Sequence, residues 1–178
     1  MRNVIFLSGI HGVGKGFISE KIKSKINIPI YSASELIRLN GISSDTNKKV
    51  DNVTNNQKQL IKSINDLIKD KIFVLDGHTC LINNQNEIES IKLEIFKEMN
   101  IIGAILIFDE INLIKDRIYK RDFINFDLEL LERLQKSEIR NMKMISNDLN
   151  IPLLFFKNGD NIQNIVDFIK VLEEKVKW

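Results

Sequence analysis

Three glycines and a lysine follow the first apolar run of the chain, at a spacing that suits phosphate binding. Gly9, Gly12, Gly14 and Lys15 come directly after the run at 4–7. Glycine lets the backbone adopt positive φ angles and approach a ligand closely. Successive backbone N–H groups at the start of a helix bind negative oxygens, and a lysine there reaches terminal phosphates. The spacing therefore predicts a loop that holds the triphosphate of a nucleotide.

The pattern G-x-x-x-x-G-K lies between a predicted strand and a predicted helix, which is the context that a P-loop requires. Gly16 and Phe17 follow the lysine, although a Ser or Thr that binds Mg²⁺ is usual there. We therefore expect the metal to be held through water and by residues elsewhere. For the His11 side chain, packing over the loop is an alternative to contact with phosphate. The predicted phosphate-binding residues are Gly9, His11, Gly12, Val13, Gly14, Lys15, Gly16 and Phe17.

An acidic residue ends the third apolar strand, which spans 72–75. Asp76 is followed by Gly77, His78 and Thr79. Ligands of parallel sheets bind at the carboxyl ends of the strands, so these residues should lie beside the phosphate loop. We expect Asp76 to orient Mg²⁺ through water, because an unpaired carboxylate is costly to bury. Gly77 permits close approach of a ligand, and His78 and Thr79 contact either the acceptor substrate or the surrounding loop.

The second strand leads into a short helix at 34–39, for which Ser32 or Ser34 can serve as the N-cap. Arg38 lies on this helix, close to the end of the strand. Arginine binds phosphate through two parallel hydrogen bonds, so Arg38 is a candidate for the acceptor side of the site. A solvated surface arginine is the alternative interpretation.

Four further arginines lie on two helices that are joined by a short break at 123–126. Arg117 and Arg121 are one turn apart and share a helix face, and Arg133 and Arg140 lie on the second helix. Arginines that close over a transferring phosphoryl group stabilise its spread negative charge. The pattern favours a short helical lid, and solvated ion pairs on the helix faces are the alternative.

Apolar runs alternate with amphipathic stretches along the whole chain. This alternation indicates an α/β, three-layer P-loop NTPase fold, with a five-stranded parallel sheet, helices on both faces and a short helical lid. The polar stretch at 40–56 carries little pattern and predicts a mobile connection. The strands are expected at 3–8, 28–31, 72–75, 101–108 and 152–156. The helices are expected from the glycine loop to 26 and at 34–39, 57–69, 87–99, 111–119, 128–149 and 161–176.

Length and composition fit one globular domain, residues 1–178. The formal net charge of +2 is too balanced for a nucleic-acid-binding surface. A single cysteine, Cys80, excludes an internal disulfide. No apolar run reaches the roughly 18 residues of a membrane span. We therefore expect a cytoplasmic domain that binds neither nucleic acid nor membrane, and the sequence leaves its oligomeric state open.

Nearly the whole chain, in order, resembles a nucleoside monophosphate kinase of the adenylate kinase group. The family's loop also has Gly directly after its lysine, as in this chain. The resemblance implies that Arg38 grips the monophosphate, that Asp76 orients hydrated magnesium, and that Arg117 and Arg121 form the base of the lid. It implies a monophosphate-binding region at about 32–70 and a lid at about 117–133. The matching segments are 9–16, 32–38, 75–78, the two lid-base arginines, and Asn158, Gly159 and Asp160, which resemble the turn beside the adenine base.

Two positions depart from that family. Phe17 replaces the threonine of the family loop, and His78 and Thr79 stand where the family has Phe-Pro-Arg. The second departure looks more like the short-lid archaeal-type adenylate kinases and their ATPase relatives. It removes one arginine for the monophosphate, so the identity of the acceptor stays open.

The leading hypothesis is transfer of the γ-phosphoryl group of MgATP to a nucleoside monophosphate, with AMP favoured. Its partners are ATP and a small phosphorylated acceptor. Lys15, Asp76, Arg117 and Arg121 are the predicted catalytic residues, with Mg²⁺ as cofactor. The alternatives are a P-loop kinase of another small molecule or nucleoside, and a slow ATPase or regulatory nucleotide-binding module. The predicted substrate-binding residues are Ser32, Ser34, Arg38, Gly77, His78, Thr79, Arg133 and Arg140.

Overall fold

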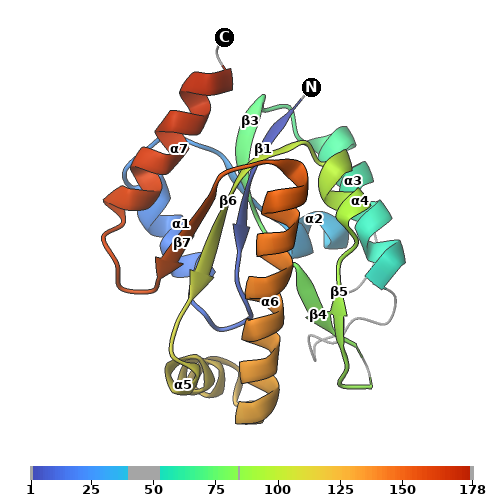
Figure 1. The fold of residues 1–178 in the computed structure, drawn as a ribbon, viewed down its shortest axis with the longest axis vertical. Coiled ribbons are helices and arrows are strands. Elements are labelled where there is room, and N and C mark those ends of the chain that lie inside the picture. The colour runs from blue at the N-terminus through green and yellow to red at the C-terminus, as the bar shows by residue number, and fades with distance from the viewer. Residues whose placement is uncertain (1, 40–52, 84, 177–178) are drawn as a thin grey trace.

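The central strands carry apolar side chains on both faces, so helices must cover the sheet on both sides. The computed structural model describes residues 2–39, 53–83 and 85–176. Within them, five parallel strands pair in the order β2-β3-β1-β6-β7, with β1 at the centre (Figure 1). This confirms the predicted fold class. The strands are β1 (Asn3–Ser8), β2 (Ile30–Ser32), β3 (Ile72–Asp76), β6 (Ile101–Phe108) and β7 (Leu153–Lys157).

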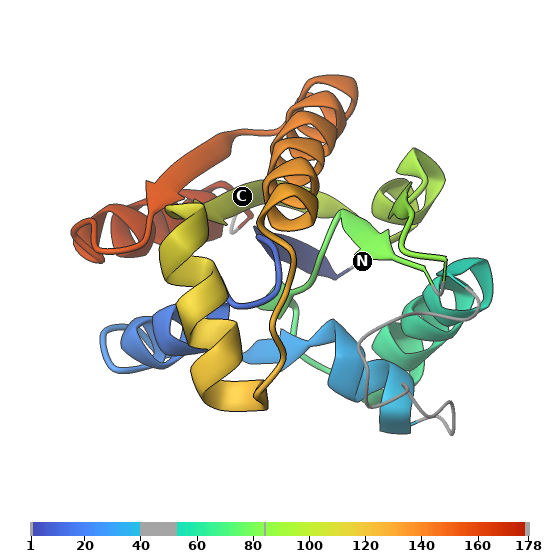
Figure 2. The same cartoon turned by 90° about the horizontal axis from the view of Figure 1, so that it is seen from below.

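Seven helices are present in the described residues, and most of them pack on one of the two faces. Figure 2 shows α1 and α7 on one side of the sheet, with α3, α4 and α6 on the other. The helices are α1 (Lys15–Lys23), α2 (Ala33–Leu39), α3 (Val53–Leu67), α4 (Leu93–Glu98), α5 (Ile111–Asp122), α6 (Leu128–Leu149) and α7 (Gln163–Val176).

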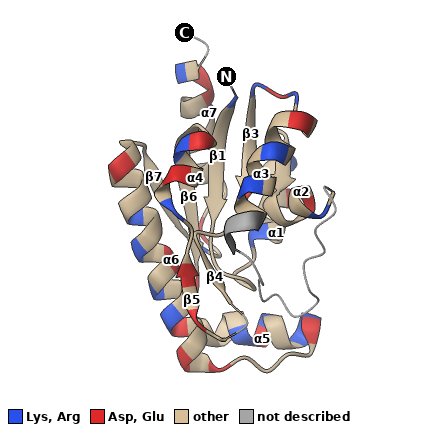
Figure 3. Cartoon of the chain, turned by 90° about the vertical axis from the view of Figure 1, so that its right-hand side faces the viewer, with Lys and Arg blue, Asp and Glu red and all other residues tan. Residues whose placement is uncertain are grey.

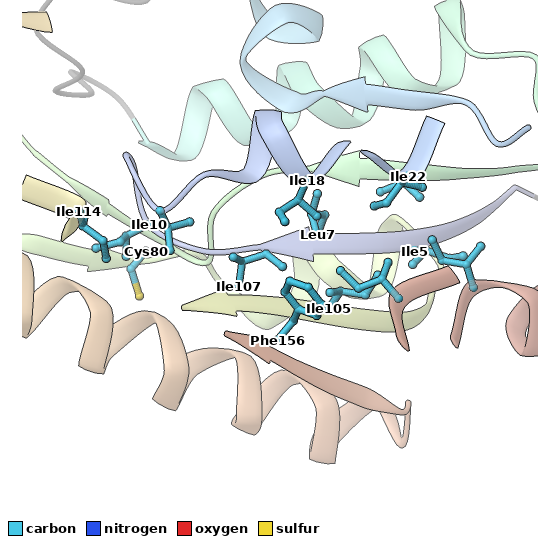
Figure 4. Packing of buried hydrophobic residues seen from close by; sticks show 14 of the residues in the cluster. Ile5, Leu7, Ile10, Ile18, Ile22, Cys80, Ile105, Ile107, Ile114 and Phe156 are labelled. Carbon is cyan, nitrogen blue, oxygen red and sulfur yellow. The ribbon is translucent and has the colours of Figure 1, made fainter. Parts of the chain in front are cut away.

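Successive side chains of β1 point to opposite faces of the sheet, and this divides the hydrophobic core into two clusters. Ile5 and Leu7 pack with apolar residues of α1 and α7, and Figure 4 shows this cluster around β1 and β6. Val4 and Phe6 face the opposite side, where α3, α4 and the second half of α6 supply the contacts. All four side chains are at most 2% exposed. Both clusters fix β1, and with it the loop that follows Ser8.

The segment at 87–99 is not one helix, and this prediction was wrong. β4 (Cys80–Ile82) and β5 (Ile88–Ser90) form an antiparallel hairpin, and α4 is shorter than expected. The side chain of Asn83 explains the turn, because its Oδ1 accepts the N–H groups of Gln85 and Glu87, both at 2.9 Å. Asn86 adopts a left-handed φ of 62° in the same turn. Side-chain-to-backbone bonding of this kind competes with helix formation.

Element ends differ from the predictions by a few residues elsewhere. α3 begins at Val53, within the stretch expected to be a connection, and residues 40–52 of that stretch lie outside the described residues. α1 ends at Lys23 rather than near 26. Within the described part of the chain, no helix is both long enough and apolar enough to cross a membrane.

α5 and α6 meet beyond the carboxyl ends of β1 and β6 (Figures 1 and 2). Phe123 ends α5 in a left-handed conformation, with φ 57°. Asp127 caps α6 by accepting the N–H of Leu130 at 3.1 Å. The two helices therefore come together beside the loop that leaves β1, where the lid was predicted.

Candidate functional site

The loop between β1 and α1 has a backbone that requires glycine at several positions, of which Gly12 and Gly14 show how its neighbours pack. Gly12 has φ 79°, and a Cβ there would lie 2.4 Å from Ile118 Cγ1 on α5. Gly14 has φ 106° and opens α1, and a Cβ there would lie 2.6 Å from Asn158 Nδ2. Side chains at these positions would meet both strain and contact with neighbours. The loop is therefore closely packed by α5 and by the segment after β7.

Lys15 is buried and its ammonium folds back onto the loop. Nζ donates to the carbonyl oxygen of Gly9 at 2.6 Å and lies 3.6 Å from Asp76 Oδ1. Burial lowers the pKa of Lys15, and the nearby carboxylates of Asp76 and Glu138 oppose that shift. Burial likewise raises the pKa of Asp76, opposed by the ammonium of Lys15. A phosphate at the loop would give this desolvated cation a stronger partner than a carbonyl.

Residues after β3 lie directly beside the loop. Asp76 pairs with Leu7 of β1 and with Ser32 of β2 in the ladder. It therefore lies at the carboxyl end of the sheet, between these two strands. A Cβ on Gly77 would lie 2.9 Å from the ring of Phe6, which explains the glycine. His78 is half-buried, and burial together with the charge of Lys15 depresses its pKa well below the usual value. The imidazole is therefore neutral at physiological pH.

Glu138 of α6 joins the loop to the segment after β3, and the sequence analysis did not identify it. The side chain is 1% exposed. Its carboxylate accepts hydrogen bonds from Ser8 Oγ at 2.5 Å, Gly9 N at 3.1 Å, Thr79 N at 3.0 Å and Cys80 N at 2.8 Å. Asn141, one turn along α6, donates to the Thr79 carbonyl at 2.8 Å. Two polar residues of one helix thus hold both walls of the site.

A sequence signal for Glu138 existed, because a charged residue falls on an apolar helical stripe. The buried side chains of α6 recur every three or four residues, and the glutamate stands among them. An acid at such a position needs hydrogen-bonding partners, since a buried unpaired charge is costly. The members of the stripe are Leu131, Leu134, Glu138, Met142 and Ile145.

Arg117 of α5 holds the phosphate loop through the backbone carbonyl of Val13. Its Nη1 donates to the Val13 carbonyl at 3.3 Å and its Nη2 donates to Asp109 Oδ2 at 2.6 Å. Asp109 follows β6, has a side chain only 2% exposed, and was also missed by the sequence analysis. Asn158, after β7, donates to the same Val13 carbonyl at 2.8 Å. Gly159 and Asp160 continue this turn and are exposed.

Arg121 contacts the side chain of His11. Nη2 of Arg121 and Oδ2 of Asp122 both contact His11 Nε2, the carboxylate at 3.1 Å. The Arg121 side chain is 56% exposed. His11 therefore connects the phosphate loop to the end of α5, a contact that neither interpretation of this residue had included.

A cavity of about 600 Å³ opens between the loop, the end of β3, α2, α3, the hairpin and α4. It brings together thirteen of the predicted residues, namely His11, Gly12, Gly14, Lys15, Gly16, Phe17, Ser32, Ser34, Asp76, Gly77, His78, Arg117 and Arg121. Its size suits a small-molecule site.

Other predicted residues lie elsewhere. Arg38 is exposed on α2 and is not among the described residues that line the cavity. Thr79 is fully buried and bonded to α6, in agreement with the loop-packing alternative. Arg133 and Arg140 line a separate cavity of about 810 Å³ together with Glu87 and Glu89 of the hairpin, and are not brought to the phosphate loop. Figure 3 shows α6 and β5 with their charged residues coloured.

The fold and the loop define a P-loop protein with a kinase-like architecture. The sequence matches the family model described as AAA domain over residues 8–143, so the chain belongs to this family. No curated protein matches the sequence. These findings support the P-loop kinase-like class and do not single out the adenylate kinase group.

Solved structures with the same fold include three kinases. Shikimate kinase from Acinetobacter baumannii in complex with shikimate has a TM-score of 0.58 at 13% identity, covering 99% of this chain and 95% of its own. A sugar kinase from Janibacter sp. HTCC2649 has a TM-score of 0.55 at 12% identity, and the match covers 98% of this chain and 95% of the kinase. A gluconokinase from Sinorhizobium meliloti 1021 has a TM-score of 0.54 at 12% identity, and the match covers 99% of this chain and 98% of the gluconokinase. At these identities the likeness shows the fold alone.

Replacing Glu138 by Gln should destabilise the protein. The amide keeps one acceptor oxygen but turns N–H groups toward buried donors, so we expect a loss of about 2–4 kcal/mol in the free energy of unfolding. Urea unfolding measures it. The control is Glu132→Gln on the exposed face of the same helix, expected to change stability by less than about 0.5 kcal/mol. Equal stability of the two variants would contradict this role for Glu138.

His78 should make stability fall in acid. The pKa of His78 in the folded protein lies well below the ordinary histidine value of 6.5, so below pH 6.5 the unfolded state binds a proton that the folded state does not. This residue should lower the free energy of unfolding by up to about 1.4 kcal/mol per pH unit from there to its folded pKa. Urea unfolding at a series of pH values measures the slope. His78→Gln should flatten it, and an unchanged slope in that variant would refute the prediction.

Proposed function

We propose that this chain is an ATP-dependent phosphotransferase that moves the γ-phosphoryl group of MgATP to a small acceptor. The observation that carries the proposal is the placement of Lys15 and Asp76 at the wall of one cavity. Lys15 lies on the phosphate loop, and Asp76 lies between the loop and the part of the cavity formed by α2, α3 and α4. A donor nucleotide on the loop would thus present its terminal phosphate to an acceptor in the same cavity.

The loop amides and Lys15 would hold the β- and γ-phosphates. Arg121 reaches the same cavity through its contact with His11, and Arg117 reaches it from α5. Both cations can stabilise the negative charge that spreads over the transferring group. Asn158, Gly159 and Asp160 stand beside the loop, where the base of the nucleotide would lie.

Magnesium fits this site as a partner of the nucleotide. Among the described residues, no group of three or more His, Cys, Asp or Glu side chains could hold a metal alone. Mg²⁺ keeps several waters in kinase sites and is bound by one or two carboxylates together with phosphates. Asp76 supplies such a carboxylate and would hold the ion through water. When bound, the ion would neutralise phosphate charge.

The reaction forms one bond and breaks another. An acceptor oxygen, from a hydroxyl group or from a monophosphate, bonds to the γ-phosphorus, and the bond from that phosphorus to the bridging oxygen breaks. ADP leaves with the electron pair, and a hydroxyl acceptor releases its proton to water. His78 is a poor base for this proton because of its depressed pKa.

Two acceptor classes compete. The adenylate kinase resemblance favours AMP, with Arg38 gripping the monophosphate. Arg38 is exposed and is not among the described residues of the cavity wall, which favours another small molecule. A slow ATPase is the third candidate, supported by Gly16 and Phe17, which place no hydroxyl after the lysine.

Lys15→Met should reduce acceptor-dependent ADP formation by about 100-fold or more, because it removes the cation that holds the terminal phosphates. A coupled ADP assay with a panel of acceptors measures this. Lys23→Met is the matched control, since Lys23 lies at the exposed end of the same helix and pairs with Glu20.

Equal turnover by wild type and Lys15→Met would overturn the proposed function. ATP binding without stimulation by any acceptor would favour the slow ATPase instead. Arg38→Ala separates the acceptor classes, because only a monophosphate kinase needs this arginine for activity with AMP.

A further inference from the structure

The two ends of the cavity differ in chemistry. The charged side chains among its described lining residues are Lys15, Asp76, Arg117 and Arg121, and they lie on or beside the phosphate loop. The far end is formed by α2, α3, the hairpin and α4. Its described lining side chains are uncharged, among them Gln57, Leu60, Ile91, Ile95, Phe96 and Met99.

Gln57 stands out at this far end. It lines the cavity from α3 and is only 5% exposed. Its Nε2 has no hydrogen-bond partner among the described residues. A buried amide that lacks a partner costs about 1–3 kcal/mol. A ligand atom that accepts a hydrogen bond from this amide would remove the cost, so a polar atom on the acceptor molecule is a suitable partner for it.

Among the described lining residues, the far end offers no cationic side chain to a charged acceptor. A phosphate or carboxylate at the far end would be buried against apolar side chains, and Arg38 is exposed rather than part of the wall. Burial of an unpaired charge is strongly unfavourable. A polyol fits poorly for a related reason, because each hydroxyl against Leu60, Ile95 or Phe96 would lose its hydrogen bonds to water.

We propose that the acceptor is an uncharged nucleoside-like molecule, a heteroaromatic ring that bears a hydroxylated group. This inference rests on the proposed phosphotransferase function. The ring lies among the apolar side chains and accepts a hydrogen bond from Gln57 Nε2 through a ring carbonyl. The hydroxylated group extends toward Ser32 and Asp76, which are neighbours in the β2–β3 ladder. Its hydroxyl oxygen bonds to the γ-phosphorus of ATP, ADP leaves, and the proton passes to water.

ADP formation should be measured with a panel of nucleosides, their 5′-monophosphates, gluconate and shikimate. For at least one nucleoside, kcat/KM should be tenfold or more higher than for its own 5′-monophosphate. This ratio corresponds to a difference of about 1.4 kcal/mol in activation free energy. Preference for a monophosphate, gluconate or shikimate, with turnover that still depends on Lys15, would overturn the acceptor class and leave the phosphotransferase function intact. Stimulation by none of them would overturn both.

Gln57→Leu tests the proposed hydrogen bond. It should raise KM for the preferred nucleoside about tenfold or more, and it should raise the stability of the unliganded protein because the unpaired donor is gone. With an analogue of that nucleoside lacking the ring carbonyl, the two proteins should have similar KM values. Gln59→Leu, on the same helix but outside the described cavity wall, is the matched control. An unchanged KM in Gln57→Leu would overturn the role of Gln57.

Discussion

A buried carboxylate holds the site together. Glu138 reaches from α6 to the start of the phosphate loop and to the segment after β3, and it accepts a hydrogen bond from the N–H of each. The donors in these two segments are 58 or more residues from Glu138 in the chain, so only the finished fold can bring them to it. A charge buried at 1% exposure persists because its acceptor capacity is filled. The loop, the end of β3 and α6 therefore form one unit.

This unit sets the electrostatics of the cavity. Lys15 is desolvated among Glu138, Asp76 and the Gly9 carbonyl, and burial works against its charge. The same burial works against the charge of Asp76 and keeps His78 neutral. A site that has already lost its water interacts strongly with an incoming anion, since fixed dipoles and charges replace the hydration shell. The anion for which this loop is shaped is a phosphate chain.

Local patterns predicted the residues that meet at the phosphate loop, because their signals lie within a few residues of each other. The glycine spacing, Lys15 and Asp76 follow strands that are recognisable by apolar runs alone. Glu138 and Gln57 were missed for the opposite reason, since their roles depend on which face of a helix meets a distant segment. Arg133 and Arg140 share α6 with Glu138 yet lie on a different face, beside the hairpin that Asn83 creates. Helical spacing alone did not show which of these faces meets the loop.

The half of the cavity that we propose for the acceptor is formed by α2, α3, the hairpin and α4. The fold is common to structures named as shikimate kinase, gluconokinase and sugar kinase, at identities of 13% or less. One fold therefore serves acceptors of different chemistry, and the identity of the acceptor must be argued from the site. In this chain α2, α3, the hairpin and α4 surround the acceptor space with apolar groups and one unpaired amide. Specificity in such a space comes from that amide, because an apolar wall selects for shape and a buried polar group rejects molecules that leave it without a partner.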